Sequence, residues 1–287
     1  MSNDFDVCIL GHGVISSQLV NQLSSENKTV LVVTENLSND NFQENVTFIS
    51  RAIFLKKAQS MIFGNVVCSL RLDYLSEELF IKLILGATLR NTPNLILMSS
   101  GSVYGETLLP VTEEVMARPE STYAKSRLNA EEIVLRVVPP STKLVILRIS
   151  NVYGHPDLED FVNQSWRSHY ESRHQTVYQS GLIYRDFIHI DDLIQAICIL
   201  LVRSHVDRDI FNISTGISLS AEEVLEIVQD LQAKGNVEIV SASKPLGILD
   251  RSILDSSKAI NALSWVPRDP KQGITEYYRR LSSKSFE

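Results

Sequence analysis

Short apolar runs alternate with segments of helical periodicity along the first half of the chain. Residues 5–10 form an apolar run that ends at a glycine turn, and residues 14–23 then carry apolar side chains at helical spacing. The alternation continues with predicted strands at 29–33, 46–49, 65–68, 94–98 and 143–149, and with helices at 75–89 and from Ser121 or Thr122 to about 138. Repeated βα units of this kind predict an α/β fold with a doubly wound parallel sheet covered by helices on both faces.

The regular alternation of predicted strands and helices ends after Gly154. We predict helices at about 157–171, 190–204, 220–233 and 271–282, joined by short strands near 176–179, 210–213 and 237–240. This pattern favours a smaller C-terminal lobe that is threaded through the end of the sheet. The predicted domains are a dinucleotide-binding domain of residues 1–154 and 186–214, and a substrate-binding lobe of residues 155–185 and 215–287.

Composition narrows the class of protein. The chain is 44% hydrophobic and 21% charged, as in soluble globular proteins, and its net charge of −7 disfavours nucleic acid or an anionic membrane as a partner. Cys8, Cys68 and Cys198 lie in apolar stretches, which predicts free thiols in a reducing compartment and no metal site. The longest apolar run, residues 196–202, is far short of the roughly 20 residues of a membrane span, so we expect a cytoplasmic protein.

The first glycine turn has the features of a dinucleotide-binding site. Gly11 permits a tight turn, Gly13 lets a pyrophosphate approach the backbone, and the N–H groups of Val14 and Ile15 begin the helix that would bind the anion. Ser16 replaces the third glycine of the usual fingerprint. The acid after the second strand, Glu35, can accept hydrogen bonds from the adenosine ribose and favours NAD over NADP.

Hydroxyl groups gather after the predicted strand at 94–98, where residues 98–105 read MSSGSVYG. Ligands in open α/β sheets bind beyond the carboxyl ends of the strands, so these hydroxyls are expected to face the cofactor. Tyr123 begins a later helix, and Arg127 returns to its face after four residues, whereas Lys125 points away. A hydroxyl, a phenol and a fixed cation can together move a proton to or from an alcohol oxygen.

The motifs together resemble those of an extended short-chain dehydrogenase/reductase of the nucleotide-sugar epimerase/dehydratase type, which has a Rossmann-type fold. Seven segments carry the resemblance in order: GHG at 11–13, SSGSVYG at 99–105, YAKS at 123–126, LRISNVYG at 147–154, RDFIHIDDL at 185–193, FNISTG at 211–216 and DSSKAINALSWVP at 255–267. The resemblance implies NAD as cofactor, a nucleotide diphosphate sugar as substrate and a homodimer as the assembly. In such a dimer the helices near 75–90 and from Tyr123 would pack against their copies.

The same resemblance implies roles for individual residues. Ser100 would orient the sugar oxygen, Tyr123 would act as acid and base, and Arg127 would supply the charge beside it. The implied cofactor residues are Gly11, Gly13, Val14, Ile15, Glu35, Ser99, Tyr123, Arg127 and Asn151. The implied substrate residues are Ser100, Ser102, Tyr104, Asn151, Arg185 and Arg251, with the two arginines as clamps for the diphosphate.

Departures from the family pattern narrow the set of reactions that the chain is expected to catalyse. Arg127 stands where relatives carry lysine, and arginine keeps the charge without releasing its proton. Ala52 replaces an adenine-binding acid, and Lys244 is the nearest substitute for an arginine that is usual near residue 245. Gly101-Ser102 replaces the Asp-Glu pair of the 4,6-dehydratases, which argues against that reaction.

Three functions are compatible with these residues. A 4-ketoreductase must exchange its cofactor in every cycle, and Ser16 and Ala52 favour such weaker retention. A 4-epimerase must instead keep NAD tightly bound. A catalytically silent NAD-binding sensor or scaffold would explain Arg127 directly.

Overall fold

The computed structural model divides the chain into two compact units, each assembled from three segments. The first unit comprises residues 1–103, 122–148 and 194–211, and the second comprises residues 104–121, 149–193 and 212–287. The structure describes residues 4–35, 43–88, 92, 94–107, 109–170, 175–178, 183–203, 207–231, 239–243 and 251–284. The two units are described separately below.

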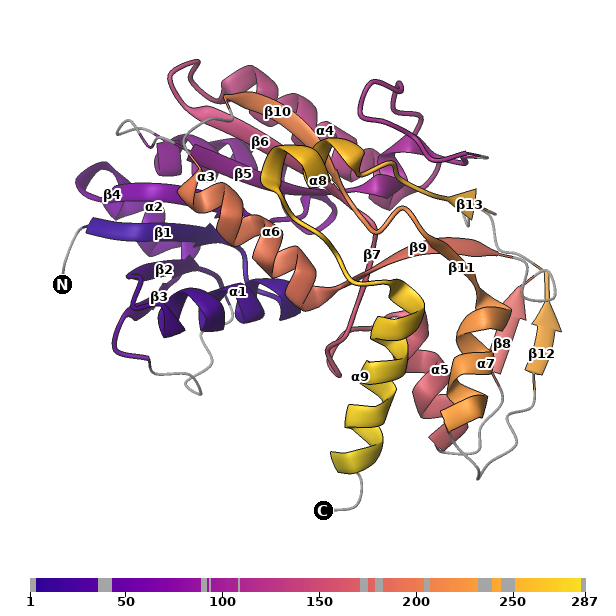
Figure 1. The fold of residues 1–287 in the computed structure, drawn as a ribbon. Coiled ribbons are helices and arrows are strands. Elements are labelled where there is room, and N and C mark those ends of the chain that lie inside the picture. The colour runs from indigo at the N-terminus through magenta and orange to yellow at the C-terminus, as the bar shows by residue number, and fades with distance from the viewer. Residues whose placement is uncertain are drawn as a thin grey trace. The chain divides into compact units, whose positions relative to one another are not determined.

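A seven-stranded sheet organises the first unit (Figure 1). Its strands are β1 (Asp4–Leu10), β2 (Val30–Val33), β3 (Val46–Ile49), β4 (Ile62–Cys68), β5 (Asn94–Ser100), β6 (Lys143–Ile149) and β10 (Arg208–Ile213). Their spatial order is β10-β6-β5-β4-β1-β2-β3, and β1 pairs in parallel with both β2 and β4. In β1, residues 7–10 are buried, as expected for a parallel strand with both faces covered. The predicted doubly wound sheet is confirmed.

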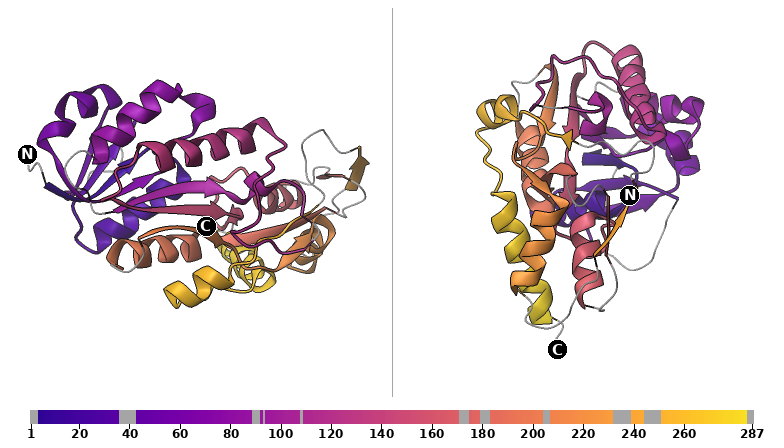
Figure 2. Two further views of the ribbon diagram at one scale, coloured as in Figure 1. Left: turned by 90° about the horizontal axis from the view of Figure 1, so that it is seen from above. Right: turned by 90° about the vertical axis from the view of Figure 1, so that its right-hand side faces the viewer.

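Helices cover both faces of this sheet (Figure 2). The helical elements associated with the sheet are α1 (Val14–Ser25), α2 (Arg51–Lys57), η1 (Ala58–Ser60), η2 (Leu72–Tyr74), α3 (Glu77–Thr88), η3 (Gly101–Tyr104), α4 (Thr122–Val137) and α6 (Ile190–Val202). Helices α2, α3 and α4 lie over one face, where Phe54, Phe80 and Val134 pack with buried side chains of the strands. Helix α1 and residues 194–202 of α6 lie over the opposite face.

The apolar residues of α3 and α4 belong mainly to the core of their own chain. The two helices that the family resemblance places at a homodimer interface carry eight apolar residues that could serve such an interface: Leu79, Phe80, Leu83, Ile84, Leu128, Ile133, Val134 and Leu135. Phe80, Leu83, Ile84, Ile133 and Val134 are buried in the first unit, so they supply no surplus apolar surface for a partner. Of the eight, only Leu135 is exposed. The homodimer therefore stays a prediction that rests on the resemblance.

The second unit contains a small sheet and a group of helices. Its strands are β7 (Asn151–Tyr153), β9 (Tyr184–His189), β11 (Ser218–Ser220) and β13 (Arg251–Ser252), and β8 (Gln175–Tyr178) pairs separately with β12 (Ile239–Ala242). Its helices are α5 (Phe161–Tyr170), α7 (Ala221–Leu231), α8 (Ser257–Leu263) and α9 (Pro270–Lys284). Helices α5, α7 and α9 lie side by side and bury Trp166, Val228 and Tyr278 with Tyr153 and Phe187 (Figure 1).

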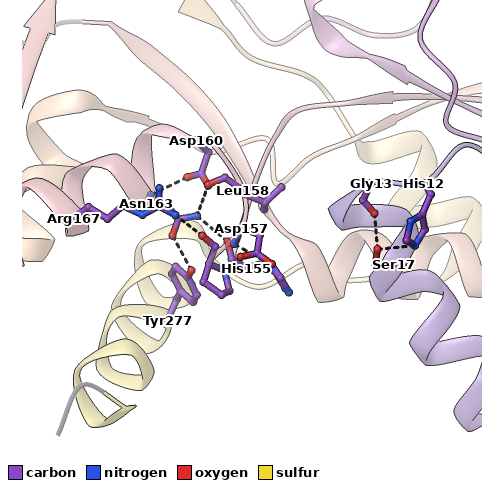
Figure 3. Close-up of polar contacts among 11 residues, drawn as sticks. His12, Gly13, Ser17, His155, Asp157, Leu158, Asp160, Asn163, Arg167 and Tyr277 are labelled. Carbon is purple, nitrogen blue, oxygen red and sulfur yellow. Dashed lines mark hydrogen bonds and ion pairs between the residues drawn. The ribbon is translucent and has the colours of Figure 1, made fainter. Parts of the chain in front are cut away.

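Helix α5 begins at a well-satisfied N-cap (Figure 3). Asp160 accepts hydrogen bonds from the backbone N–H groups of Val162 and Asn163, and Tyr277 of α9 donates to the Asn163 side chain at 2.7 Å. Burial raises the pKa of Asp160 to about 6. These contacts fix α5 against α9 and account for the polar residues of this loop as structural groups.

Several elements were not predicted from the sequence. These elements are β7, β9, β11, β13 and α8. The structure also groups residues 104–121 and 186–193 with the second unit, whereas the predicted boundaries placed them in the dinucleotide-binding domain. Among the described residues, no helix is long and apolar enough to cross a membrane.

Candidate functional site

The glycine turn after β1 presents free backbone donors. Gly11 has a φ of +99°, and a Cβ there would lie 2.8 Å from Ser69 Oγ, so only glycine fits without strain. Gly13 is the N-cap of α1 and has no side-chain cap, with open space where its Cβ would be. The first N–H groups of α1, at Val14 and Ile15, therefore have no capping side chain, and the first turn carries no acid. These features fit a bound pyrophosphate.

Ser16 replaces the third glycine of the fingerprint without leaving a buried polar group unpaired. Its hydroxyl bonds Ser69 Oγ at 2.8 Å, and Ser69 Oγ donates to the Leu10 carbonyl at 3.2 Å. The hydroxyl therefore ties the start of α1 to the end of β4.

A histidine inside the turn adds a contact that the sequence analysis did not single out. Ser17 donates to the Gly13 carbonyl and lies 3.0 Å from His12 Nε2 (Figure 3). Because the serine hydroxyl has one proton, His12 Nε2 is the donor in this bond when the hydroxyl donates to the Gly13 carbonyl. The ring packs edge-on against Phe48, and burial lowers the pKa of His12.

Glu35 lies beside a cation that is distant in the sequence. Its carboxylate accepts a hydrogen bond from the Arg51 backbone N–H at 3.1 Å, and the Arg51 Nε lies 3.9 Å from the same oxygen. The sequence around Glu35 shows no basic neighbour, but the start of α2 brings one to it. The Glu35 side chain is 55% exposed, whereas the Arg51 Nε is buried, so solvent reaches the carboxylate side of the pair.

We expect Glu35 to give NADH an affinity at least about tenfold higher than that of NADPH, because its carboxylate opposes the additional phosphate. Glu35→Ala should bring the two dissociation constants within about threefold, since Arg51 then faces the phosphate alone. The measurement is fluorescence titration of both cofactors at low salt. Arg51→Met is the matched control and should increase the preference for NADH over NADPH. Equal affinities of the wild type for the two cofactors would contradict the assignment of Glu35 to the ribose site.

Tyr123 and Arg127 lie on the same face of α4, as their spacing predicted. Arg127 Nε donates to the Tyr123 phenol oxygen at 3.2 Å, and Nη1 donates to the carbonyls of Leu70 and Met98 at 3.1 and 3.3 Å. A guanidinium only donates, so the phenol keeps its own proton for another acceptor. Within the described part of the chain, Nη2 has no hydrogen-bond partner and is left for a ligand.

The two serines at the end of β5 point to opposite sides, as successive strand residues do. Ser100 bonds the Ser102 hydroxyl at 3.0 Å, so these two predicted residues lie together. Ser99 is buried and donates to Glu131 of α4. The Ser99 hydroxyl is therefore committed to the protein interior, so a contact with the cofactor would use the backbone of this residue, and its role as a cofactor ligand stays a prediction.

Glu131 also forms a buried ion pair with Arg148 of β6. Arg148 Nη2 donates to Glu131 Oε2 at 2.7 Å, and Arg148 Nε reaches both carboxylate oxygens at 3.2 Å. The two side chains are 2% and 7% exposed. The pair fastens α4, which carries Tyr123, to the sheet.

The second unit holds the other predicted substrate residues. Tyr104 is buried, and its hydroxyl donates to the Asn212 side chain at 2.9 Å, so the structure gives this predicted substrate residue a structural contact. Asn151 is exposed on β7 and donates to the Asp186 carbonyl at 2.9 Å.

Arg185 and Arg251 lie on paired strands on either side of one tyrosine. Arg251 stands opposite Tyr184 in the register of β13 and β9, and its guanidinium lies 4.7 Å from the Tyr184 ring centre. Arg185 Nη1 donates to the Tyr184 carbonyl at 2.8 Å. Arg251 leaves its strand on the same face as Tyr184, whereas Arg185 is the next residue of β9 and leaves on the opposite face. The two predicted clamp residues are thus neighbours in the backbone but start from different faces, and Lys244 lies outside the described residues.

Asp186 is a buried acid that sequence reasoning did not interpret. It accepts hydrogen bonds from Thr215, Gly216 and Leu254, which join three separate segments of the second unit. Burial raises its pKa to about 6. Its partners lie far away in the sequence, so no local signal revealed them.

Acidic and sulfur groups do not form a further site in the described regions. No group of three His, Cys, Asp or Glu side chains there is arranged to hold a metal ion. Cys8 and Cys68 are buried, and Cys198, predicted to be buried, is only partly so. In the described regions, the candidate binding and proton-transfer groups therefore lie at the carboxyl ends of β1, β4 and β5 in the first unit, and around Tyr184 in the second.

A parallel sheet with an uncapped helix after its first strand defines a dinucleotide-binding protein of the Rossmann type. Residues 7–214 match the family model described as the NAD dependent epimerase/dehydratase family. The chain belongs to this family. Its cofactor is therefore NAD, in agreement with the prediction from the glycine turn and Glu35.

Individual relatives differ in the reaction that their names give. The chain is 28% identical over 192 residues to an uncharacterized UDP-glucose epimerase of Bacillus subtilis. This alignment covers 66% of the chain and 60% of that protein. It is 30% identical over 183 residues to a dTDP-4-dehydro-6-deoxyglucose reductase of Escherichia coli, with coverage of 59% and 54%. The chain thus spans little more than half the length of these curated relatives.

The fold agrees over almost the whole chain with a solved structure. UDP-glucose 4-epimerase of Thermotoga maritima superposes with a TM-score of 0.81 at 22% identity, covering 98% of this chain and 99% of that one. At this identity the likeness establishes the shared fold.

Proposed function

We propose that the chain is an NAD(H)-dependent nucleotide-sugar oxidoreductase that reduces a 4-keto(-6-deoxy)hexose nucleotide at C4. The observation that carries this proposal is the bond from Arg127 to the Tyr123 oxygen, which leaves the phenol proton available, with Arg127 itself bonded to the Met98 carbonyl of β5. Similarity to the reductase of Escherichia coli supports the substrate class. The absence of an Asp-Glu pair at Gly101-Ser102 argues against water elimination.

In this reaction NADH supplies the hydride that C4 receives. Tyr123 donates its proton to the C4 oxygen, so the ketone becomes a secondary alcohol and the phenol becomes a phenolate. Ser100 orients the same oxygen through its hydroxyl. Arg127 stabilises the phenolate, and its free Nη2 is available to the nicotinamide ribose.

The other residues would bind the two ligands. The N–H groups of Val14 and Ile15 would hold the pyrophosphate of the cofactor, and Glu35 would hold the adenosine ribose. Arg185 and Arg251 would bind the diphosphate of the substrate, since a planar guanidinium matches phosphate oxygens in pairs.

A 4-epimerase is the second candidate, and Arg127 favours it in one respect. An epimerase removes a proton from the C4 oxygen and returns it, so it needs no supply from solvent. A reductase consumes one proton in each cycle, and arginine does not relay protons. The reductase therefore requires that solvent reprotonate Tyr123 directly.

One experiment separates these functions. Purified protein is mixed with NADH and a 4-keto-6-deoxyhexose nucleotide, and NADH absorbance and sugar products are followed together. We expect NADH oxidation equal to alcohol formed. Interconversion of two C4 epimers with no net NADH oxidation, and with NAD retained through purification, would instead identify an epimerase. Tight NAD binding with no conversion of any nucleotide sugar would identify a silent binding protein.

The role of Arg127 can be tested by restoring lysine. We expect Arg127→Lys to preserve or raise turnover, because an ammonium group donates to the phenol oxygen and also exchanges its proton with solvent. Arg127→Ala should weaken NADH binding and lower turnover together. Steady-state kinetics and NADH titration of both variants make the measurement; a lysine variant as impaired as the alanine variant would contradict the assignment.

A further inference from the structure

A second arginine lies against the proposed proton donor. The Arg71 guanidinium carbon is 4.9 Å from the centre of the Tyr123 ring and 4.6 Å from the centre of the Tyr74 ring. Arg71 follows the end of β4, and Tyr74 belongs to the short helix η2. Tyr123 is thus contacted by two cations, with Arg127 bonded to its oxygen and Arg71 stacked on its ring.

The Arg71 side chain is held in place. Its Nε donates to Asp73 Oδ1 at 3.0 Å, and its Nη2 donates to Asp73 Oδ2 in a second, short bond. The hydrogen bond with Asp73 raises the pKa of Arg71, and burial opposes this effect in part. With 38% of its side chain exposed, Arg71 remains partly solvated.

The stacking contact favours the charged form of the tyrosine. A cation over an aromatic ring is attracted to the negative face of the ring, and the attraction grows when the ring system carries a full negative charge. The carboxylate of Asp73 offsets part of this field.

We propose that Arg71 is a positioning residue of the proposed active site, which holds the Tyr123 ring and stabilises the phenolate left after proton transfer. The inference rests on the proposed role of Tyr123. It gives the site two fixed cations, of which one is bound to the carbonyls of Leu70 and Met98 and the other to Asp73. Because arginine at 127 does not relay a proton, the phenolate must persist until solvent reprotonates it, and a second cation stabilises it during that interval.

The test measures the phenolate itself, without turnover. The chain has nine tyrosines, so the ultraviolet absorbance of tyrosinate is recorded with and without Tyr123→Phe, and the difference isolates Tyr123. At about pH 10, near the ordinary pKa of a tyrosine, we expect Arg71→Met to lower the ratio of phenolate to phenol by about three- to tenfold. Arg71→Lys should recover part of the loss, because it keeps the charge.

Arg136→Met is the matched control. Arg136 pairs with Glu77 at 3.2 Å and touches no tyrosine in any contact described. Its loss should therefore leave the ratio of phenolate to phenol at Tyr123 unchanged. Thermal unfolding of each variant checks that it is folded. An unchanged ratio in folded Arg71→Met would overturn the inference and leave Arg71 with a structural role.

Turnover separates this inference from the proposed function. If the wild type reduces a ketosugar nucleotide, Arg71→Met should lower kcat more than it raises KM, and Arg71→Lys should restore part of kcat. A rise in KM alone, with an unchanged phenolate ratio, would show that Arg71 binds an anionic group of the substrate instead. If the wild type converts no sugar nucleotide but the phenolate ratio falls as expected, the proposed reaction fails while the charge effect of Arg71 stands.

Discussion

Tyr123→Phe is expected to lower turnover by about 10²- to 10⁴-fold, the range for loss of a general acid. NADH binding should change by less than about threefold, because the ring and its stacking on Arg71 remain. The substitution removes the single O–H that Arg127 leaves available to the substrate. Only a transition-state interaction is lost, so kcat falls and the dissociation constant of NADH does not.

Lys125→Met on the same helix is the control for this substitution. Lys125 is exposed and points away from Tyr123, so its loss should leave both constants unchanged. Steady-state kinetics at several pH values and NADH titration provide the data. Turnover that survives in Tyr123→Phe would assign proton donation to another group, with Ser100 the next to examine.

Arg148→Met should destabilise the protein by about 3–5 kcal/mol, since it leaves Glu131 buried without its partner. The ion pair is almost fully enclosed, and Ser99 alone cannot replace the three hydrogen bonds that Arg148 donates to the carboxylate. Urea unfolding monitored by circular dichroism gives the free energy of unfolding. Because the pair fastens α4 to the sheet, NADH affinity should also fall at temperatures well below the unfolding midpoint.

The double substitution Glu131→Met with Arg148→Met tests why stability is lost. It separates the cost of losing the ion pair from the cost of leaving one charge buried and unpaired. Two apolar side chains of similar volume should recover most of the stability, because neither leaves a buried charge. The exposed pair Arg136–Glu77 gives the comparison, and Arg136→Met should cost less than about 1 kcal/mol. A cost as small for Arg148→Met would mean that solvent reaches Glu131.

The strands of the main sheet were predictable because burial on both faces leaves a plain apolar run. Residues 30–33 read VLVV and are all buried, so composition alone identified β2. In contrast, β9 reads YRDFIH and contains the buried polar groups Asp186 and His189. Asp186 is satisfied by partners from distant segments, such as Leu254, and no local pattern encodes such partners. The printed partner of His189 is local, because its Nδ1 accepts from the Asp191 N–H.

In the candidate site too, contacts between residues close in the sequence were predictable, and contacts between distant residues were not. The Tyr123–Arg127 pair was predictable, because four residues of helix place both side chains on one face. The Ser99–Glu131 bond spans 32 residues and the Tyr104–Asn212 bond spans 108, so no local pattern indicated that either hydroxyl was already engaged. The place of Arg71 between two aromatic rings likewise depends on the fold.

The strand order has a consequence for how the chain can be divided. β10 is the outermost strand beside β6, and the Leu144 N–H donates to the Asp207 carbonyl where they meet. A fragment for expression that stops at Ile149 would place β6 at the edge of the sheet, and β6 is almost wholly buried in the complete chain. In the complete chain the edge strand is β10, which is less buried over its first residues. An exposed apolar edge templates association with other chains, so an isolated cofactor-binding unit must include α6 and β10.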